Sequence, residues 1–197
     1  MKIIIQHKLL LISNLLIFCF AVSCQNKKEV NENRKGFVYA ASNEVKNLDP
    51  LSLATRAEEW ISGHIFNTLF QLDGNLELYP VLIKTYKVSA DSLTYHFELK
   101  KNIYFHNCTA FDNDTSREMT AKDVIFSFKR LEKSPQKNLI GKFLLQDTST
   151  HSISDTALVA IDKYNFKIHL DTIYSNFLGL LALPNTKIVS QKAVKHF

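Results

Sequence analysis

Three neighbouring residues carry side chains suited to metal binding or nucleophilic chemistry: His106, Asn107 and Cys108. A cysteine thiolate activated by a nearby imidazole is a common nucleophile and metal ligand. The alternative, which the sequence favours, is that Cys108 ends a strand and has no chemical role. The sequence contains no C-x-x-C pair, nucleophile elbow, Gly-rich phosphate loop or His-Glu-x-x-His motif. It therefore predicts no enzyme activity, no metal site and no cofactor, although a catalytic set assembled from distant residues stays open.

Cys24 stands in a different setting, at the end of a mostly apolar run from Leu9 to Val22. The run follows two lysines, suits the core of a secretory signal and is short for a membrane span. Its last residues, Ala21-Val22-Ser23-Cys24, resemble a bacterial lipobox, with alanine where leucine is usual. We therefore expect residues 1–23 to be a lipoprotein signal peptide and Cys24 to carry the lipid. An ordinary cleaved or tethering signal with an incidental cysteine is the alternative.

The residues after Cys24 are polar and lack apolar periodicity. Residues 24–36 are rich in Asn, Lys and Glu, so they are expected to form a flexible tether. Cys19 lies inside the predicted signal peptide. Cys108 is then left without a cysteine partner for an intrachain disulfide in the mature chain.

The composition is that of an ordinary globular protein, with 46% hydrophobic and 22% charged residues in 197. The formal net charge is +5, and it falls to +3 without the two lysines of the predicted signal peptide. The basic residues are interleaved with acidic ones rather than gathered in a block. This pattern argues against a nucleic-acid partner.

The elements that must position any site are clearest between residues 93 and 131. Apolar and polar residues alternate over residues 93–99, which predicts a half-buried strand, and residues 103–105 are predicted to form a second strand of a hairpin. Thr120 and Asp123 have the spacing of a capping box, with Asp in place of Glu or Gln. The apolar stripe Val124, Ile125, Phe128 and Leu131 then predicts a helix.

Further elements are expected on both sides of this stretch. They are a first strand over 36–41, a turn at Asp49-Pro50, a helix over 58–70, an exposed loop over 110–118, a short helix over 139–145 and a hairpin of strands 157–161 and 166–170. His96 and His169 alternate with apolar neighbours in strands and are expected to face solvent.

These motifs resemble solute-binding protein family 5, the extracytoplasmic receptors of oligopeptide, dipeptide and nickel ABC importers. The resemblance covers most of residues 37–197. It includes "L-D-P" at 48–50, "I-F-x-x-L-F-x-x-D-G" at 65–74, a strand motif and a helix motif. The strand motif comprises Asp91, Leu93, Thr94, Tyr95, Phe97, Leu99, Lys100, Ile103, Phe105 and His106. The helix motif comprises Thr120, Ala121, Asp123, Val124, Phe126, Ser127, Phe128 and Arg130. Cys108 stands where the family typically has glycine.

The resemblance implies a mixed α/β (α+β) fold, like a type II periplasmic binding protein, with two lobes that close on the solute. Family members are much longer, so residues 37–197 are interpreted as the N-terminal part of such a receptor. About Asn67 to Ser190 is expected to form the family's smaller extra domain. In the family, the loop after "L-D-P" lines the cleft. Here that loop is Leu53, Ala54, Thr55 and Arg56.

The implied function is capture of oligopeptides and delivery to a membrane permease with its ATPase. The expected location is the bacterial cell envelope, where the protein would be lipid-anchored on the periplasmic or extracytoplasmic face. Arg56 is suited to bind a ligand carboxylate, although an exposed arginine at a helix start is an equally good interpretation. Nickel chelates, sugars and haem, which other members bind, stay open as ligands. The alternative from another class is a lipoprotein fragment with a structural or surface-interaction role and no transport activity.

Overall fold

The computed structural model describes residues 38, 40–41, 44–111, 117–133, 143–144, 146 and 152–197. By its internal contacts the chain divides into Met1–Ala40 and Ala41–Phe197, and the elements below belong to the second unit. The predicted signal peptide and tether lie outside the described residues, and so do residues 36, 37 and 39 of the predicted first strand. Residues 38, 40 and 41 are described and are not in a strand. The helices and strands are α2 (Arg56–Ile65), β1 (Phe70–Leu72), β2 (Leu78–Pro80), β3 (Ile83–Val88), β4 (Thr94–Leu99), α3 (Ala121–Arg130), η2 (Leu131–Lys133), β5 (Leu158–Ala160), β6 (Asn165–His169), α4 (Phe177–Leu180), η3 (Pro184–Thr186) and α5 (Gln191–His196).

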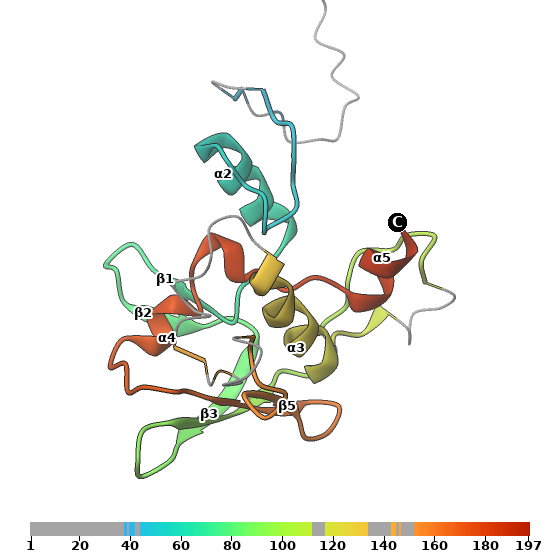
Figure 1. Cartoon of the computed structure of the whole chain (residues 1–197). Coiled ribbons are helices and arrows are strands. Elements are labelled where there is room, and N and C mark those ends of the chain that lie inside the picture. The colour runs from blue at the N-terminus through green and yellow to red at the C-terminus, as the bar shows by residue number, and fades with distance from the viewer. Residues whose placement is uncertain are drawn as a thin grey trace, which may run out of the picture. The chain divides into compact units, whose positions relative to one another are not determined.

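The core is built on a four-stranded antiparallel sheet in the order β3-β4-β6-β5, with β1 and β2 forming a separate two-stranded ribbon. Phe97 of β4 lies opposite Phe166 of β6, and their rings stack with centroids 5.0 Å apart. Helix α3 packs against β5 (Figure 1). Its Val124 and Phe128 belong to the same core. The buried aromatic face of β4 therefore forms the centre of this unit.

The strand predicted from alternation is confirmed as β4, whose Tyr95, Phe97 and Leu99 are buried. The predicted hairpin partner is wrong, because β3 and β6 occupy the two edges of β4. Residues 103–105 pair instead with residues 117–119. The amide of Phe105 donates to the Arg117 carbonyl at 2.9 Å, and the amide of Met119 donates to the Ile103 carbonyl at 2.8 Å.

The predicted helix after Thr120 is confirmed as α3. The Thr120 amide donates to Asp123 Oδ2 at 2.9 Å, and the Thr120 hydroxyl donates to the same oxygen at 2.8 Å. Aspartate therefore serves at the position where a capping box usually has Glu or Gln. Val124, Phe128 and Leu131 are buried and Ile125 is half-buried, as the stripe predicted.

The predicted bounds of the first helix are wrong. Helix α2 runs from Arg56 to Ile65, whereas Leu69 is buried in a bend and Phe70 is buried in β1. Its buried residues are Ala57, Glu58 and Ser62, whereas Trp60 of the predicted apolar stripe is 46% exposed. The helix begins two residues earlier than predicted because Thr55, its N-cap, caps the first turn together with Glu58.

The second predicted hairpin is confirmed as β5 and β6, joined by a turn around Asp162. The turn at Asp49-Pro50 is also confirmed, since the amide of Ser52 donates to the Asp49 carbonyl at 2.9 Å. His96 is exposed as predicted. His169 is half-buried, and its Nδ1 shares a 2.7 Å hydrogen bond with Thr94 Oγ1.

The predicted exposed loop over 110–118 is only partly correct. Ala110 is 4% exposed, and Glu118 is tied to the β5–β6 turn by hydrogen bonds from Lys163 (2.6 Å) and from the Tyr164 hydroxyl (2.8 Å). Residues 112–116 and most of the predicted helix 139–145 lie outside the described residues, but Leu144 forms a β-bridge with Leu170 and is therefore not helical. Among the helices of the described residues, none is both long and apolar enough to cross a membrane.

Candidate functional site

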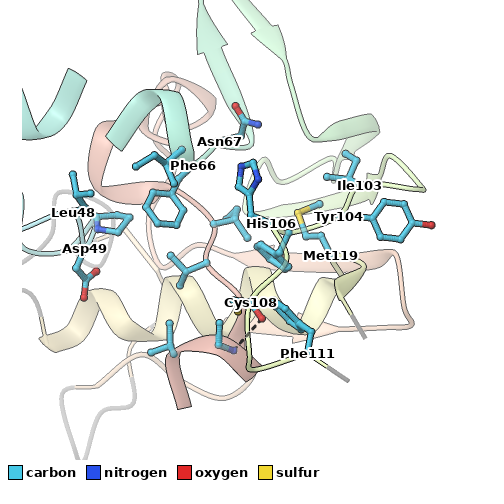
Figure 2. Close-up of a pocket in the computed structure, with 18 of the residues that line it drawn as sticks. Leu48, Asp49, Phe66, Asn67, Ile103, Tyr104, His106, Cys108, Phe111 and Met119 are labelled. Carbon is cyan, nitrogen blue, oxygen red and sulfur yellow. Dashed lines mark hydrogen bonds between the residues drawn. The ribbon is translucent and has the colours of Figure 1, made fainter. Parts of the chain in front are cut away.

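A pocket of about 800 Å³ lies where the segments that flank the sheet meet the residues after β4. Figure 2 shows Leu48 and Asp49 on one side of it, Ile103 and Tyr104 on the other, and His106 between them. The lining residues are Leu48, Asp49, Pro50, Ile65, Phe66, Asn67, Leu82, Ile103, Tyr104, Phe105, His106, Asn107, Cys108, Phe111, Met119, Arg130, Ile188, Val189, Ser190, Ala193, Val194 and Phe197.

Most of the pocket surface is apolar, with a few polar groups such as His106 and Asn107. Tyr104 and Phe197 line it and are 47% and 85% exposed, so the pocket is open to solvent on their side. Its volume and character suit a small solute, or an apolar side chain of a larger one.

One side of the pocket is the segment Lys46–Ser52, called the wall segment below, which is neither helix nor strand. Its start is held by the Glu58 carboxylate. Glu58 Oε1 accepts hydrogen bonds from the amides of Lys46 (3.0 Å) and Asn47 (3.1 Å). Glu58 Oε2 accepts from the amides of Ala54 (2.9 Å) and Thr55 (3.1 Å). These four donors, Ala54 and Lys46 above all, lower the pKa of Glu58 to about 2, so the carboxylate is charged at neutral pH.

The middle of the wall segment is held from α3. Arg130 Nη2 donates to Asp49 Oδ2 at 2.6 Å, and Asp49 Oδ1 accepts from the amide of Leu51 at 3.1 Å. The Arg130 side chain is 17% exposed and the Asp49 side chain 37%, so this ion pair is partly shielded from water. The "L-D-P" and helix motifs, noted separately in the sequence, therefore meet at one contact.

Two further side chains of α3 hold the start of α5 and the chain just before it. Asp123 Oδ1 accepts from the amide of Gln191 at 2.9 Å, and Ser127 Oγ accepts from the amide of Val189 at 3.0 Å. Val189 lines the pocket. The three residues Asp123, Ser127 and Arg130 form the α3 polar face, which joins two segments far apart in sequence.

The predicted ligand loop Leu53, Ala54, Thr55 and Arg56 leads into α2, and only Arg56 belongs to the helix. Leu53 is 7% exposed, Thr55 is the N-cap, and Arg56 is exposed. None of the four is among the residues that line the pocket of Figure 2. Their role in ligand binding stays a prediction.

The structure brings His106 and Cys108 to the pocket, where Cys108 is a free, half-buried thiol. Within the part of the chain that the structure describes, no cluster of three His, Cys, Asp or Glu residues can hold a metal ion. The role of Glu58 was not predicted, although the spacing Thr55-x-x-Glu58 is that of a capping box and was the available signal.

Comparison with solved structures shows which class of protein has this fold. The chain superposes with a TM-score of 0.58 and 25% identity on the periplasmic binding protein DppA of Helicobacter pylori in complex with a peptide, over 76% of this chain and 30% of that one. It superposes on the pheromone receptor PrgZ with a TM-score of 0.63 and 20% identity, over 79% of this chain and 31% of that one, a likeness of fold alone. The fold is that of the α/β periplasmic binding proteins, and this chain covers part of it.

The family follows from the sequence comparison. The description "Bacterial extracellular solute-binding proteins, family 5 Middle" matches residues 77–197, more than half of the chain. The chain belongs to this family, whose description places its members outside the cytoplasm.

Curated relatives carry solute-binding names rather than enzyme names. The glutathione-binding protein GsiB of Escherichia coli is 29% identical over 163 residues, which are 83% of this chain and 29% of the relative. Di/tripeptide-binding protein 1 of Pseudomonas aeruginosa is 26% identical over 158 residues, which are 78% of this chain and 29% of the relative. The chain therefore spans about 29% of the length of these relatives.

Proposed function

We propose that this chain is the N-terminal part of the substrate-binding lipoprotein of a bacterial ABC importer, which captures oligopeptides and delivers them to a membrane permease and its ATPase. Family membership carries the proposal, together with relatives named for binding glutathione and di- or tripeptides. An open, mostly apolar pocket at the junction of the flanking segments is compatible with a solute of that size.

The proposal includes the expected division of the chain, with about Asn67 to Ser190 as the smaller extra domain. One contact supports it, because the amide of Ile188 donates to the Asn67 carbonyl at 2.9 Å. The chain thus enters and leaves the proposed domain at neighbouring positions, which is what an inserted domain requires. The flanking residues would belong to the larger lobe.

Calorimetric titration of the complete natural polypeptide tests the substrate class. We expect heat of binding with glutathione or with di- and tripeptides, and none with a mixture of free amino acids. Absence of heat with every peptide would remove oligopeptides from the proposal. Binding of a nickel chelate, sugar or haem instead would assign another ligand of the family, and no solute at all would favour the alternative of a structural lipoprotein.

Arg56 is proposed to bind the carboxylate of the captured peptide from the start of α2. Replacing it with alanine is expected to weaken the binding of peptides with a free C-terminus about tenfold, because a charge-assisted contact of this kind is worth on the order of 1.4 kcal/mol. Titration should show no change for C-terminally amidated peptides. Lys122→Ala, at another exposed cation, is the matched control, and an equal loss in both variants would rule out a specific role for Arg56.

Cys24 is proposed to carry the lipid anchor. Cys24→Ala is expected to abolish incorporation of labelled palmitate and to move the protein from the membrane fraction to the soluble fraction, because lipid attachment needs the thiol. Cys108→Ala is the matched control and should label like the wild type. Labelling that survives in Cys24→Ala would show that the cysteine is incidental.

A further inference from the structure

Helix α3 presents three polar side chains at positions i, i+4 and i+7, which lie along one face of a helix. Asp123 and Ser127 are 8% and 7% exposed. Buried polar groups of this kind cost free energy of folding unless they are hydrogen-bonded. Each of these two side chains forms a hydrogen bond with a partner outside the helix. The α3 polar face therefore binds segments outside the helix, whereas the apolar stripe of α3 packs into the core.

The first two members of this face hold the backbone where the chain enters α5. Ser127 binds the amide of Val189 and Asp123 binds the amide of Gln191, so alternate amides of one segment point to α3. The amide of Ile188, between Lys187 and Val189, points the other way and donates to Asn67. The segment is thus held from both sides.

The third member, Arg130, reaches a different segment 81 residues away in sequence. Its guanidinium lies 5.9 Å from the centroid of the Phe126 ring and donates to Asp49 from that position. Asp49 in turn accepts from Leu51, so its orientation sets the turn of the wall segment. Side chains thus join this segment to α3 through Arg130 and to α2 through Glu58.

We propose that Arg130 is a positioning residue. By holding Asp49, it fixes the distance between the wall segment and the segment before α5. This distance in turn determines the affinity for the solute. The last step rests on the proposed function. Because α3 is one helix, its polar face keeps the two pocket-lining segments, around Asp49 and Val189, at a fixed separation. Loss of the Arg130 contact frees one of them.

Hydrogen exchange of the full chain without solute tests the positioning itself. In Arg130→Gln the amides of Leu51 and Ser52 are expected to exchange about fivefold faster, the effect of losing one partly shielded ion pair. Lys129→Gln is the matched control, because Lys129 is the neighbouring cation and forms an ion pair of equal length, 2.6 Å, with Asp155. Equal exchange at Leu51 and Ser52 in both variants and the wild type would overturn the proposal.

A second variant separates positioning from direct contact with the solute. Asp49→Asn keeps an oxygen for the Leu51 amide but removes the charge that faces Arg130. If Arg130 acts by positioning, Arg130→Gln and Asp49→Asn should accelerate amide exchange at Leu51 and Ser52 by the same factor. The double variant should exchange no faster than either single variant. Arg130→Lys should restore part of the protection.

Titration with glutathione and trialanine then connects positioning to affinity. Arg130→Gln and Asp49→Asn are both expected to weaken binding about fivefold, the same factor as for exchange, since both release the same segment. Weakening by Arg130→Gln alone would mean that Arg130 touches the solute, and would overturn the positioning role. If neither peptide binds the wild type, the proposed function fails, while the exchange experiment still decides whether Arg130 holds the wall segment.

Discussion

Replacement of Phe97 by alanine is expected to lower the free energy of unfolding by about 3–5 kcal/mol, the usual cost of removing a buried phenylalanine ring. Phe97 is 2% exposed, and its ring lies near those of Phe70, Tyr86, Tyr95 and Phe166 at centroid distances of 5.0–6.3 Å. The cavity would open in the middle of the sheet, where strands on both sides limit how far it can collapse. Urea unfolding of the purified protein measures the loss.

His96 supplies the control for this prediction. It precedes Phe97 on the same strand, points to the other face of the sheet and is exposed. His96→Ala should change the free energy of unfolding by no more than about 0.5 kcal/mol. A similar small effect for Phe97→Ala would mean that the aromatic face of β4 is not the centre of the core.

Glu58→Gln is expected to cause the largest loss of stability among substitutions that keep side-chain size. Each carboxylate oxygen of Glu58 accepts two backbone amides. A glutamine keeps one such oxygen but turns its NH₂ group toward the other two amide donors. The four donors are at the start of α2 or in the wall segment, so both should loosen. Thermal unfolding near pH 7 measures the effect, with Glu77→Gln, at an exposed carboxylate, as the control.

The pH dependence of this contribution follows from the pKa of Glu58. The pKa falls from 4.5 to about 2 on folding, chiefly through the Ala54 and Lys46 amides. A lowered pKa stabilises the fold above pH 4.5, and that contribution is lost as the pH falls toward 2. Glu58→Gln should therefore unfold with a weaker dependence on pH in this range than the wild type. An unchanged dependence would show that Glu58 is not a source of acid sensitivity.

The sequence was sufficient for elements whose signals are local. The alternation of Tyr95, Phe97 and Leu99 predicted β4, and the spacing of Thr120 and Asp123 predicted the start of α3. Both signals depend on residues only a few positions apart, so they do not depend on how the rest of the chain packs. Alternation, however, says which face of a strand is buried and does not name its partner. The pairing of β4 with β6 instead of residues 103–105 was therefore out of reach.

The candidate site was harder to predict because its contacts join distant residues. Asp49 and Arg130 both stood in motifs, yet nothing in either motif says that they meet. Helix α2 was misplaced for another reason: Leu69 and Phe70 are apolar because they are buried in or next to a strand, and their spacing only imitates a helical stripe. The cap at Thr55 and Glu58 was the stronger signal, and it marked the true start.

Among the strands that the structure describes, β3 pairs on one side only, with β4. All its residues after Ile83 are exposed, among them Tyr86 and Val88, a composition that invites another strand to add on. Lys84 and Lys87 interrupt that row with charged side chains, and Lys84 forms an ion pair with Glu98 of β4 at 2.7 Å. Charge along an exposed edge strand disfavours edge-to-edge pairing in general, because two copies would bring like charges together.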